Sequence, residues 1–98
     1  MKIEKNLNGS TLGIALVGRL DTTTAPMLDD AIKNGLDGVT ELLFDFEKLE
    51  YISSAGLRVL LAAQKAMSKQ GKMIIRNVDK DIMEVFDITG FSDILTIE

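Results

Sequence analysis

The start of the chain shows the apolar patterns of two β-strands. Apolar and charged side chains alternate over residues 1–7, as they do in a strand with one face in water. Asn8-Gly9-Ser10 follows, and Asn-Gly between two strand-like runs is the strongest short signal for a hairpin turn. Residues 12–17 carry apolar side chains on both faces, which is typical of a strand covered on both sides. The pattern predicts an antiparallel hairpin that places residues 12–17 inside the molecule.

Beyond the hairpin, helical spacing of apolar residues alternates with short strand-like runs. The predicted helices each have capping residues at the start and a glycine at the end, and they span Asp21 or Thr22 to Asp37-Gly38 with Pro26 in the first turn, Ser53 or Ser54 to Gln70-Gly71, and Asp79 to Gly90. The predicted strands cover residues 41–46, 73–75 and 94–97, and residues 47–52 form a loop. Each strand after the hairpin is therefore separated from the next by one helix.

This alternation predicts the fold class. The element order β-β-α-β-α-β-α-β indicates an α/β fold in which right-handed crossovers make most neighbouring strands parallel. The opening hairpin makes the β-sheet mixed, and the helices pack on the sheet. A chain of 98 residues has room for one hydrophobic core. We therefore expect a single domain over residues 1–98.

Composition narrows the classes of function. No run approaches the ~18 apolar residues of a membrane span, and residues 1–5 alternate where a secretory signal needs a continuous apolar stretch, so we expect a cytoplasmic protein without a membrane partner. The net charge of -4 disfavours nucleic acid. The chain has no cysteine and no histidine, which removes the usual metal ligands and the usual general base for a serine nucleophile. We predict no metal site, no cofactor and no catalytic residue, and we favour a binding module over an enzyme.

The sharpest candidate site is Ser53-Ser54-Ala55-Gly56-Leu57, where two hydroxyls and a glycine lie at the start of a helix. Free N–H groups and the positive end of the helix dipole favour an anion there, so a phosphate on either serine would be stabilised by ~0.3–1 kcal/mol or somewhat more. A serine that only caps the helix gives the same pattern. A nucleophile elbow fits less well, because Ile52 stands where that motif has glycine. The residues alone leave a phosphate acceptor and a simple cap open.

A second candidate lies at the preceding strand-to-helix corner. Asp21 and Thr22 offer a carboxylate and a hydroxyl on a loop, where helix caps and partner contacts are both common. Asp45, at the end of the strand over residues 41–46, has two interpretations. Its carboxylate could orient the loop that carries Ser54, or it could accept hydrogen bonds from local backbone.

Four segments in register resemble the STAS domain family and, within it, the bacterial anti-sigma factor antagonists. The resemblance covers nearly the whole chain. Its motifs are Gly18-Arg19-Leu20-Asp21 followed by Thr24-Ala25-Pro26, Asp45 ahead of the serine loop, Ser54-x-Gly56-Leu57, and Ile88-Thr89-Gly90-Phe91.

The resemblance implies a phosphorylation switch. The usual loop of the family is Asp-Ser-Ser/Thr-Gly-Leu, and its phosphoacceptor serine maps onto Ser54. Ser53 replaces the aspartate here and becomes an alternative site of modification. The unmodified protein would bind an anti-sigma factor that is also a serine kinase, and so release a sigma factor. Phosphorylation of Ser54 would switch this binding off, and a PP2C-like phosphatase would reverse it.

The same resemblance implies where the partner binds. Any cofactors would belong to the kinase and the phosphatase, and the chain itself would be a monomer or a weak dimer. The residues expected to form the partner-binding surface come from the two candidate loops and are Asp21, Thr22, Ser53, Ser54, Ala55, Gly56, Leu57 and Arg58.

Two other functions stay open. A STAS-like scaffold or ligand-sensing module would not be phosphorylated, and Ser54 would then be only a cap. A small enzyme would require a deep pocket lined by titratable groups, which nothing in the sequence demands.

Overall fold

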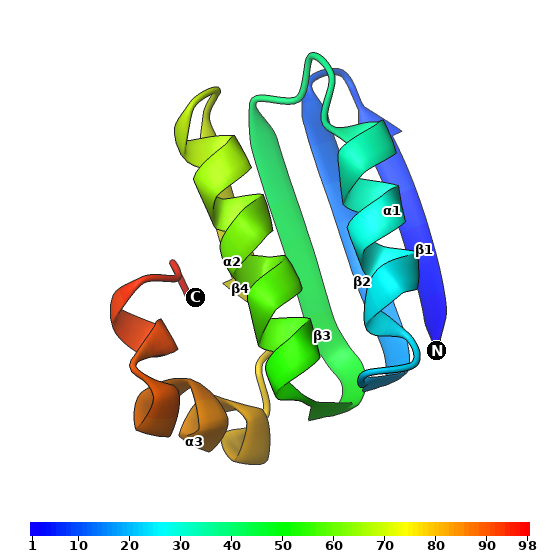
Figure 1. Ribbon diagram of the computed structural model, residues 1–98. Coiled ribbons are helices and arrows are strands. Elements are labelled where there is room, and N and C mark those ends of the chain that lie inside the picture. The colour runs from blue at the N-terminus through cyan, green and yellow to red at the C-terminus, as the bar shows by residue number, and fades with distance from the viewer.

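Four strands form one mixed sheet in the order β1-β2-β3-β4 in the computed structural model, which describes all 98 residues. The strands β1 (Lys2–Asn8) and β2 (Thr11–Leu20) make the predicted antiparallel hairpin. The strand β3 (Glu41–Ile52) lies parallel to β2, and β4 (Lys72–Arg76) lies parallel to β3. Figure 1 shows this order across the sheet. The predicted α/β class and mixed sheet are confirmed.

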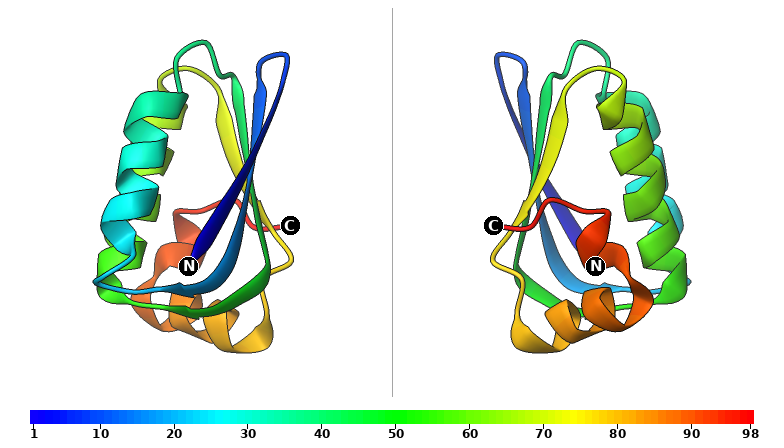
Figure 2. Two further views of the ribbon diagram at one scale, coloured as in Figure 1. Left: turned by 90° about the vertical axis from the view of Figure 1, so that its right-hand side faces the viewer. Right: turned by 90° about the vertical axis from the view of Figure 1, so that its left-hand side faces the viewer.

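The helices α1 (Ala25–Gly35) and α2 (Ser54–Ser68) lie side by side on one face of the sheet (Figures 1 and 2). The helix α3 (Lys80–Thr89) and the short 3-10 helix η1 (Phe91–Asp93) lie at the end of the sheet, and the opposite face carries no helix. The covered face is apolar because alternate strand residues point toward the helices. The buried members on the two central strands include Leu12, Ile14 and Leu16 in β2 and Leu42, Phe44 and Phe46 in β3.

The strand β3 is longer than the sequence pattern predicts. The prediction of a strand over 41–46 followed by a loop over 47–52 is wrong, because the strand continues to Ile52. Two adjacent exposed charges, Glu47 and Lys48, break the alternation and resemble a loop, yet Leu49 and Ile52 are buried again. The register between β2 and β3 shifts at this point. Such an irregularity lets the pairing continue although the alternation does not.

The predicted last strand over residues 94–97 is reduced to one bridge. Ile97 pairs with Ile75 of β4 in parallel, and the Ile75 N–H donates to the Thr96 carbonyl oxygen at 2.9 Å. Gly90 ends α3 in the left-handed conformation, as predicted. Ile94, which caps η1, still has helical backbone angles, so extended pairing is confined to Ile97. The other two helices end slightly before the predicted stops, at Gly35 and Ser68.

None of the helices is both long and apolar enough to cross a membrane. The longest helix, α2, has exposed side chains at Arg58 and Lys65, and its C-cap Lys69 is also exposed. Its buried side packs into one core cluster of 24 residues, to which the strands β2, β3 and β4 contribute. The sheet and the two side-by-side helices therefore form a rigid support for the loops at the carboxyl ends of β2 and β3.

Candidate functional site

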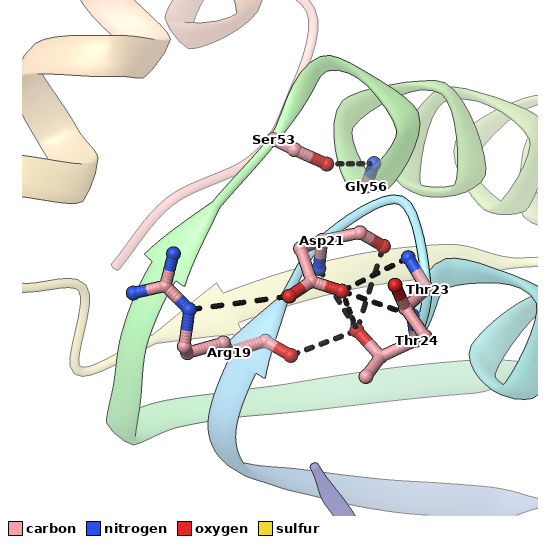
Figure 3. Close-up of polar contacts among 6 residues, drawn as sticks. All are labelled: Arg19, Asp21, Thr23, Thr24, Ser53 and Gly56. Atoms are coloured by element: carbon pink, nitrogen blue, oxygen red, sulfur yellow. Dashed lines mark hydrogen bonds and ion pairs between the residues drawn. The ribbon is translucent and has the colours of Figure 1, made fainter.

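The two candidate loops meet because β2 and β3 are parallel neighbours. Leu20 pairs with Ile52 at the carboxyl ends of these strands. The Ser53 backbone N–H donates to the Leu20 carbonyl oxygen at 2.9 Å, which joins the two loops directly. Figure 3 shows the loop that carries Asp21 beside the start of α2. The structure thus brings both sequence-predicted sites together at the carboxyl ends of the two central strands.

The two neighbouring serines have different structural roles. Ser53 has extended backbone and is the N-cap of α2, since its Oγ accepts a hydrogen bond from the Gly56 N–H at 3.3 Å (Figure 3). Ser54 is the first residue of the helix, and its side chain is exposed. The sequence left open which serine caps the helix. Because Ser53 takes that role, the Ser54 hydroxyl faces solvent without a capping role.

Gly56 and Leu57 lie beneath the surface of the site. A Cβ atom on Gly56 would stand 2.7 Å from Leu20 Cγ and 3.0 Å from Ile52 Cγ1, so this position has no room for a larger residue. Leu57 is only 6% exposed and belongs to the core. Both residues are expected from the sequence to belong to the partner-binding surface, but the helical period turns them toward the sheet and buries them. They hold the start of α2 against the ends of β2 and β3.

Asp21 organises the neighbouring loop. Its Oδ1 accepts hydrogen bonds from the Thr23 and Thr24 N–H groups, each at 3.0 Å, and its Oδ2 lies 3.9 Å from Arg19 Nε (Figure 3). The Thr24 N–H is the main cause that holds the pKa of Asp21 below its ordinary value. The helix α1 begins at Ala25 with Thr24 as N-cap, so the prediction of Asp21 or Thr22 as the cap is wrong. Asp21 instead caps the turn that precedes the helix. Aspartate favours both positions, so the sequence pattern does not distinguish them.

Two residues of the site were missed by the sequence reasoning. The Arg19 guanidinium lies over the Tyr51 ring, 4.2 Å from its centroid, and also pairs with Asp21. Arg19 and Tyr51 are cross-strand partners at the ends of β2 and β3. Tyr51 is 40% exposed and extends the surface of the two loops. The predicted strand ends at Phe46, so the sequence offers no reason to pair Tyr51 with Arg19. Cross-strand neighbours follow from the register of the two strands.

Asp45 does not contact the serine loop. Its Oδ1 accepts hydrogen bonds from the Glu47 N–H and from Asn77 Nδ2, each at 3.0 Å. The Asn77 side chain is the main cause that lowers the pKa of Asp45. Of its two interpretations, bonding of local backbone is therefore the one observed, together with a bond to the residue that follows β4. Asp45 links β3 to the residue that follows β4 and does not orient Ser54.

A groove runs between α1 and α2 next to Ser54. Its volume is about 320 Å³, and its lining combines small apolar side chains with three polar ones. The lining residues are Thr22, Ala25, Pro26, Asp29, Ala55, Arg58, Val59 and Ala62. A larger hollow of about 540 Å³ lies on the bare face of the sheet, away from the serine loop. No three His, Cys, Asp or Glu side chains gather as metal ligands.

Comparison with known protein families agrees with this fold and site. A model of the STAS domain family matches residues 2–98. The chain belongs to the STAS domain family. The resemblance inferred from its motifs is thus confirmed over almost the full length of the chain.

Several relatives of this STAS domain carry regulatory names. The Bordetella bronchiseptica protein BtrV, named as an anti-sigma factor antagonist, is 32% identical over 99% of this chain and 85% of its own length. The anti-sigma-B factor antagonist of Bacillus subtilis is 26% identical over 99% of this chain and 90% of its own length.

Solved structures share the fold of this STAS domain. An anti-sigma factor antagonist from Mycobacterium paratuberculosis is similar with a TM-score of 0.88 and 21% identity, covering 98% of this chain and 83% of that one. The anti-sigma factor antagonist SpoIIAA in its unphosphorylated form is similar with a TM-score of 0.73 and 22% identity, covering 99% and 87%. These likenesses establish the fold.

Proposed function

We propose that this STAS domain is an anti-sigma factor antagonist that is switched by phosphorylation of Ser54. In the unmodified form it binds an anti-sigma factor that is also a serine kinase, and a sigma factor is released. The observation that carries the proposal is the exposed Ser54 hydroxyl at the start of α2, which the Ser53 cap leaves accessible beside the Asp21 loop. The proposed activity is binding and not catalysis.

The names of the relatives support the binding partner. Both BtrV and the Bacillus subtilis protein are named as anti-sigma factor antagonists and match over 99% of this chain. SpoIIAA, which shares the fold, has been solved in a phosphorylated form as well as an unphosphorylated one. A phosphate on Ser54 is compatible with that precedent.

Electrostatics explains how a phosphate would end binding. Phosphorylation adds about -1.5 to -2 charges to the loop at pH 7. Burying this charge against a partner costs desolvation, and an interface penalty of ~3 kcal/mol lowers affinity about a hundredfold. The domain itself tolerates the added charge, because the first turn of α2 contains no acidic residue and its free N–H groups favour an anion. The fold therefore stays the same in both forms.

Ser53 is the weaker candidate for modification. Its Oγ accepts the Gly56 N–H at 3.3 Å, and its side chain is less exposed than that of Ser54. A kinase that modified Ser53 would have to open the cap, which costs ~0.5–2 kcal/mol. A PP2C-like phosphatase completes the proposed cycle by removing the phosphate from Ser54. The ATP and metal ions of these steps belong to the two partner enzymes, and the cycle operates in the cytoplasm.

The proposed partner surface combines the exposed parts of both loops. Thr22, Ser54 and Arg58 are exposed, and Asp21, Ser53 and Ala55 are half-buried beside them. The groove between α1 and α2 begins among these residues. A partner that covers Ser54 therefore also meets the mouth of the groove. The isolated chain acts as a monomer or weak dimer.

The main alternative is a STAS scaffold or ligand-sensing module that is never phosphorylated. The test is incubation of the wild type, Ser54→Ala and Ser53→Ala with anti-sigma kinases from the same genome and Mg-ATP, followed by intact mass. We expect one phosphate on the wild type and on Ser53→Ala, and none on Ser54→Ala. An unmodified wild type with every kinase would favour the scaffold and reject the switch.

A further inference from the structure

Arg58 follows Ser54 by one turn of α2, so the two side chains are neighbours on the helix surface. Arg58 Nε donates a long hydrogen bond of 3.5 Å to the Ser54 carbonyl oxygen. This contact turns the guanidinium back toward the first turn of the helix. Both side chains are exposed. A group attached to the Ser54 Oγ would thus lie within reach of Arg58.

Arg58 has no ionic partner in the unmodified chain. All four ion pairs of the chain join other residues. Asp21 on the neighbouring loop pairs with Arg19, and Asp29 in the lining of the groove pairs with Lys33 at 2.9 Å. The guanidinium is therefore an uncompensated cation beside Ser54 in a chain whose net charge is -4.

We propose that Arg58 binds the phosphate on Ser54 and forms an ion pair with it inside the same chain. The inference rests on the proposed function for the presence of that phosphate. A guanidinium presents N–H groups in a planar fork that matches phosphate oxygens, and such charge-assisted bonds are stronger than neutral ones. A rotation of the Arg58 side chain is sufficient, because its backbone belongs to the rigid helix α2.

The ion pair connects Ser54 to the groove. Arg58 also lines the groove between α1 and α2, where it is the only cationic residue of the lining. In the unmodified chain this cation is available to a carboxylate of a partner seated there. The phosphate takes the same cation and adds negative charge at the mouth of the groove. Modification therefore changes the charge of the groove although no residue of the groove is modified.

The test measures the second pKa of the phosphate by ³¹P NMR. Phosphoserine is incorporated at position 54 during translation, so the experiment needs no kinase and no partner. The variants are Arg58→Gln, Arg58→Lys and, as a matched control, Lys65→Gln, which removes an exposed charge from the last turn of the same helix. Lys65 lies ~16 Å from Ser54 along the helix axis, which is beyond the ~10 Å Debye length at 0.1 M salt.

We expect Arg58→Gln to raise the second phosphate pKa by at least about half a unit, because the opposite charge that favours the dianion is lost. Arg58→Lys should give an intermediate value, since the charge stays but the planar fork is lost. Lys65→Gln should leave the pKa unchanged. The helix dipole acts equally in all variants and cancels in the comparison. An Arg58→Gln protein that titrates like the wild type overturns the inference.

A second readout follows the arginine itself. In ¹⁵N-labelled protein, the Arg58 Nε–H signal should shift on phosphorylation of Ser54, and an unmoved signal counts against the ion pair. Failure of these two measurements leaves the kinase assay on Ser54 untouched. Conversely, a chain that no kinase modifies loses the proposed function, while the incorporated phosphoserine still decides whether Arg58 binds a phosphate.

Discussion

The Ser53 backbone N–H donates a hydrogen bond to the Leu20 carbonyl oxygen at 2.9 Å, and this bond fixes the start of α2 beside the end of β2. The same residue uses its side chain to cap the helix through the Gly56 N–H. Ser53 therefore holds the geometry of the site, and Ser54 is free for chemistry. The predictions below separate these two roles.

Stability should distinguish the two serines. Ser53→Ala removes the N-cap of α2 and should lower the free energy of unfolding by ~0.5–2 kcal/mol. Ser54→Ala leaves that cap in place and should change it by less than ~0.5 kcal/mol, as expected for an exposed position. Urea denaturation of the two variants provides the comparison. Equal losses in both would mean that Ser54 shares the capping role.

Partner binding should depend on Ser54, although the stability of the fold depends more on Ser53. Ser54→Ala should bind the anti-sigma factor kinase and stay bound in the presence of ATP, because it cannot be modified. Ser54→Asp should bind at least about tenfold more weakly, since a charge is added where the interface must be desolvated. Isothermal titration calorimetry measures both affinities.

The matched control for the added charge is Ser68→Asp. Ser68 is exposed at the far end of α2, so it receives the same charge on the same helix away from the loops. We expect this variant to bind like the wild type. If Ser54→Asp bound as tightly as Ser68→Asp, the charge mechanism would be wrong.

Gly56 should be intolerant of any side chain. A Cβ atom there would meet Leu20 and Ile52 at 3.0 Å or less, so Gly56→Ala should lower the free energy of unfolding by ~1–3 kcal/mol through overpacking. Gly35→Ala is the control, because its Cβ would stand 3.7 Å from Leu12 Cδ2, an ordinary contact. That variant should be neutral or more stable by up to ~1 kcal/mol, since alanine favours a helix. Thermal and urea unfolding should agree, and a stable Gly56→Ala protein would contradict the close packing.

Acid should lower the free energy of unfolding through Asp21 and Asp45. Both carboxyls have a pKa below their ordinary value of 3.8 in the folded chain. A lowered folded pKa contributes stability that is present above the unfolded value and is lost as pH falls through the folded value. We therefore expect the unfolding free energy to decline below pH ~5.

Variants should identify the carboxyls responsible. Asp45→Asn and Asp21→Asn should each reduce the acid dependence, and the exposed Asp37→Asn serves as the control for removal of one charge. Urea midpoints measured from neutral pH down to the acid range give the slopes. A slope in either site variant as steep as in the control would reject that carboxyl as a source of the acid dependence.

The sequence predicts the parts of the fold that depend on repeated patterns. The hairpin around Gly9, the apolar face of Leu42, Phe44 and Phe46 and the stop at Gly90 all follow from local chemistry and are observed. Such features repeat over several residues or depend on a glycine conformation that no other residue adopts readily.

Features that depend on one contact or on strand register could not be predicted in this way. Ser53 and Ser54 have the same side chain, and the φ and ψ angles of Ser53 decide which one caps α2. Tyr51 joins the site only because β3 continues through a register shift past Glu47 and Lys48. The strand predicted over residues 94–97 is reduced to one bridge, because its apolar residues give a strand pattern although only Ile97 pairs with β4.

The hairpin of β1 and β2 offers an attachment point away from the serine loop. Its turn pairs Asn8 with Thr11 at the first residue of β2, whereas Ser53 is bonded to Leu20 at the last residue of the same strand. The chain contains no cysteine, so one introduced thiol at Asn8 would be unique. Immobilised or dye-labelled through that point, every molecule on a sensor surface would present its serine loop outward, toward the analyte.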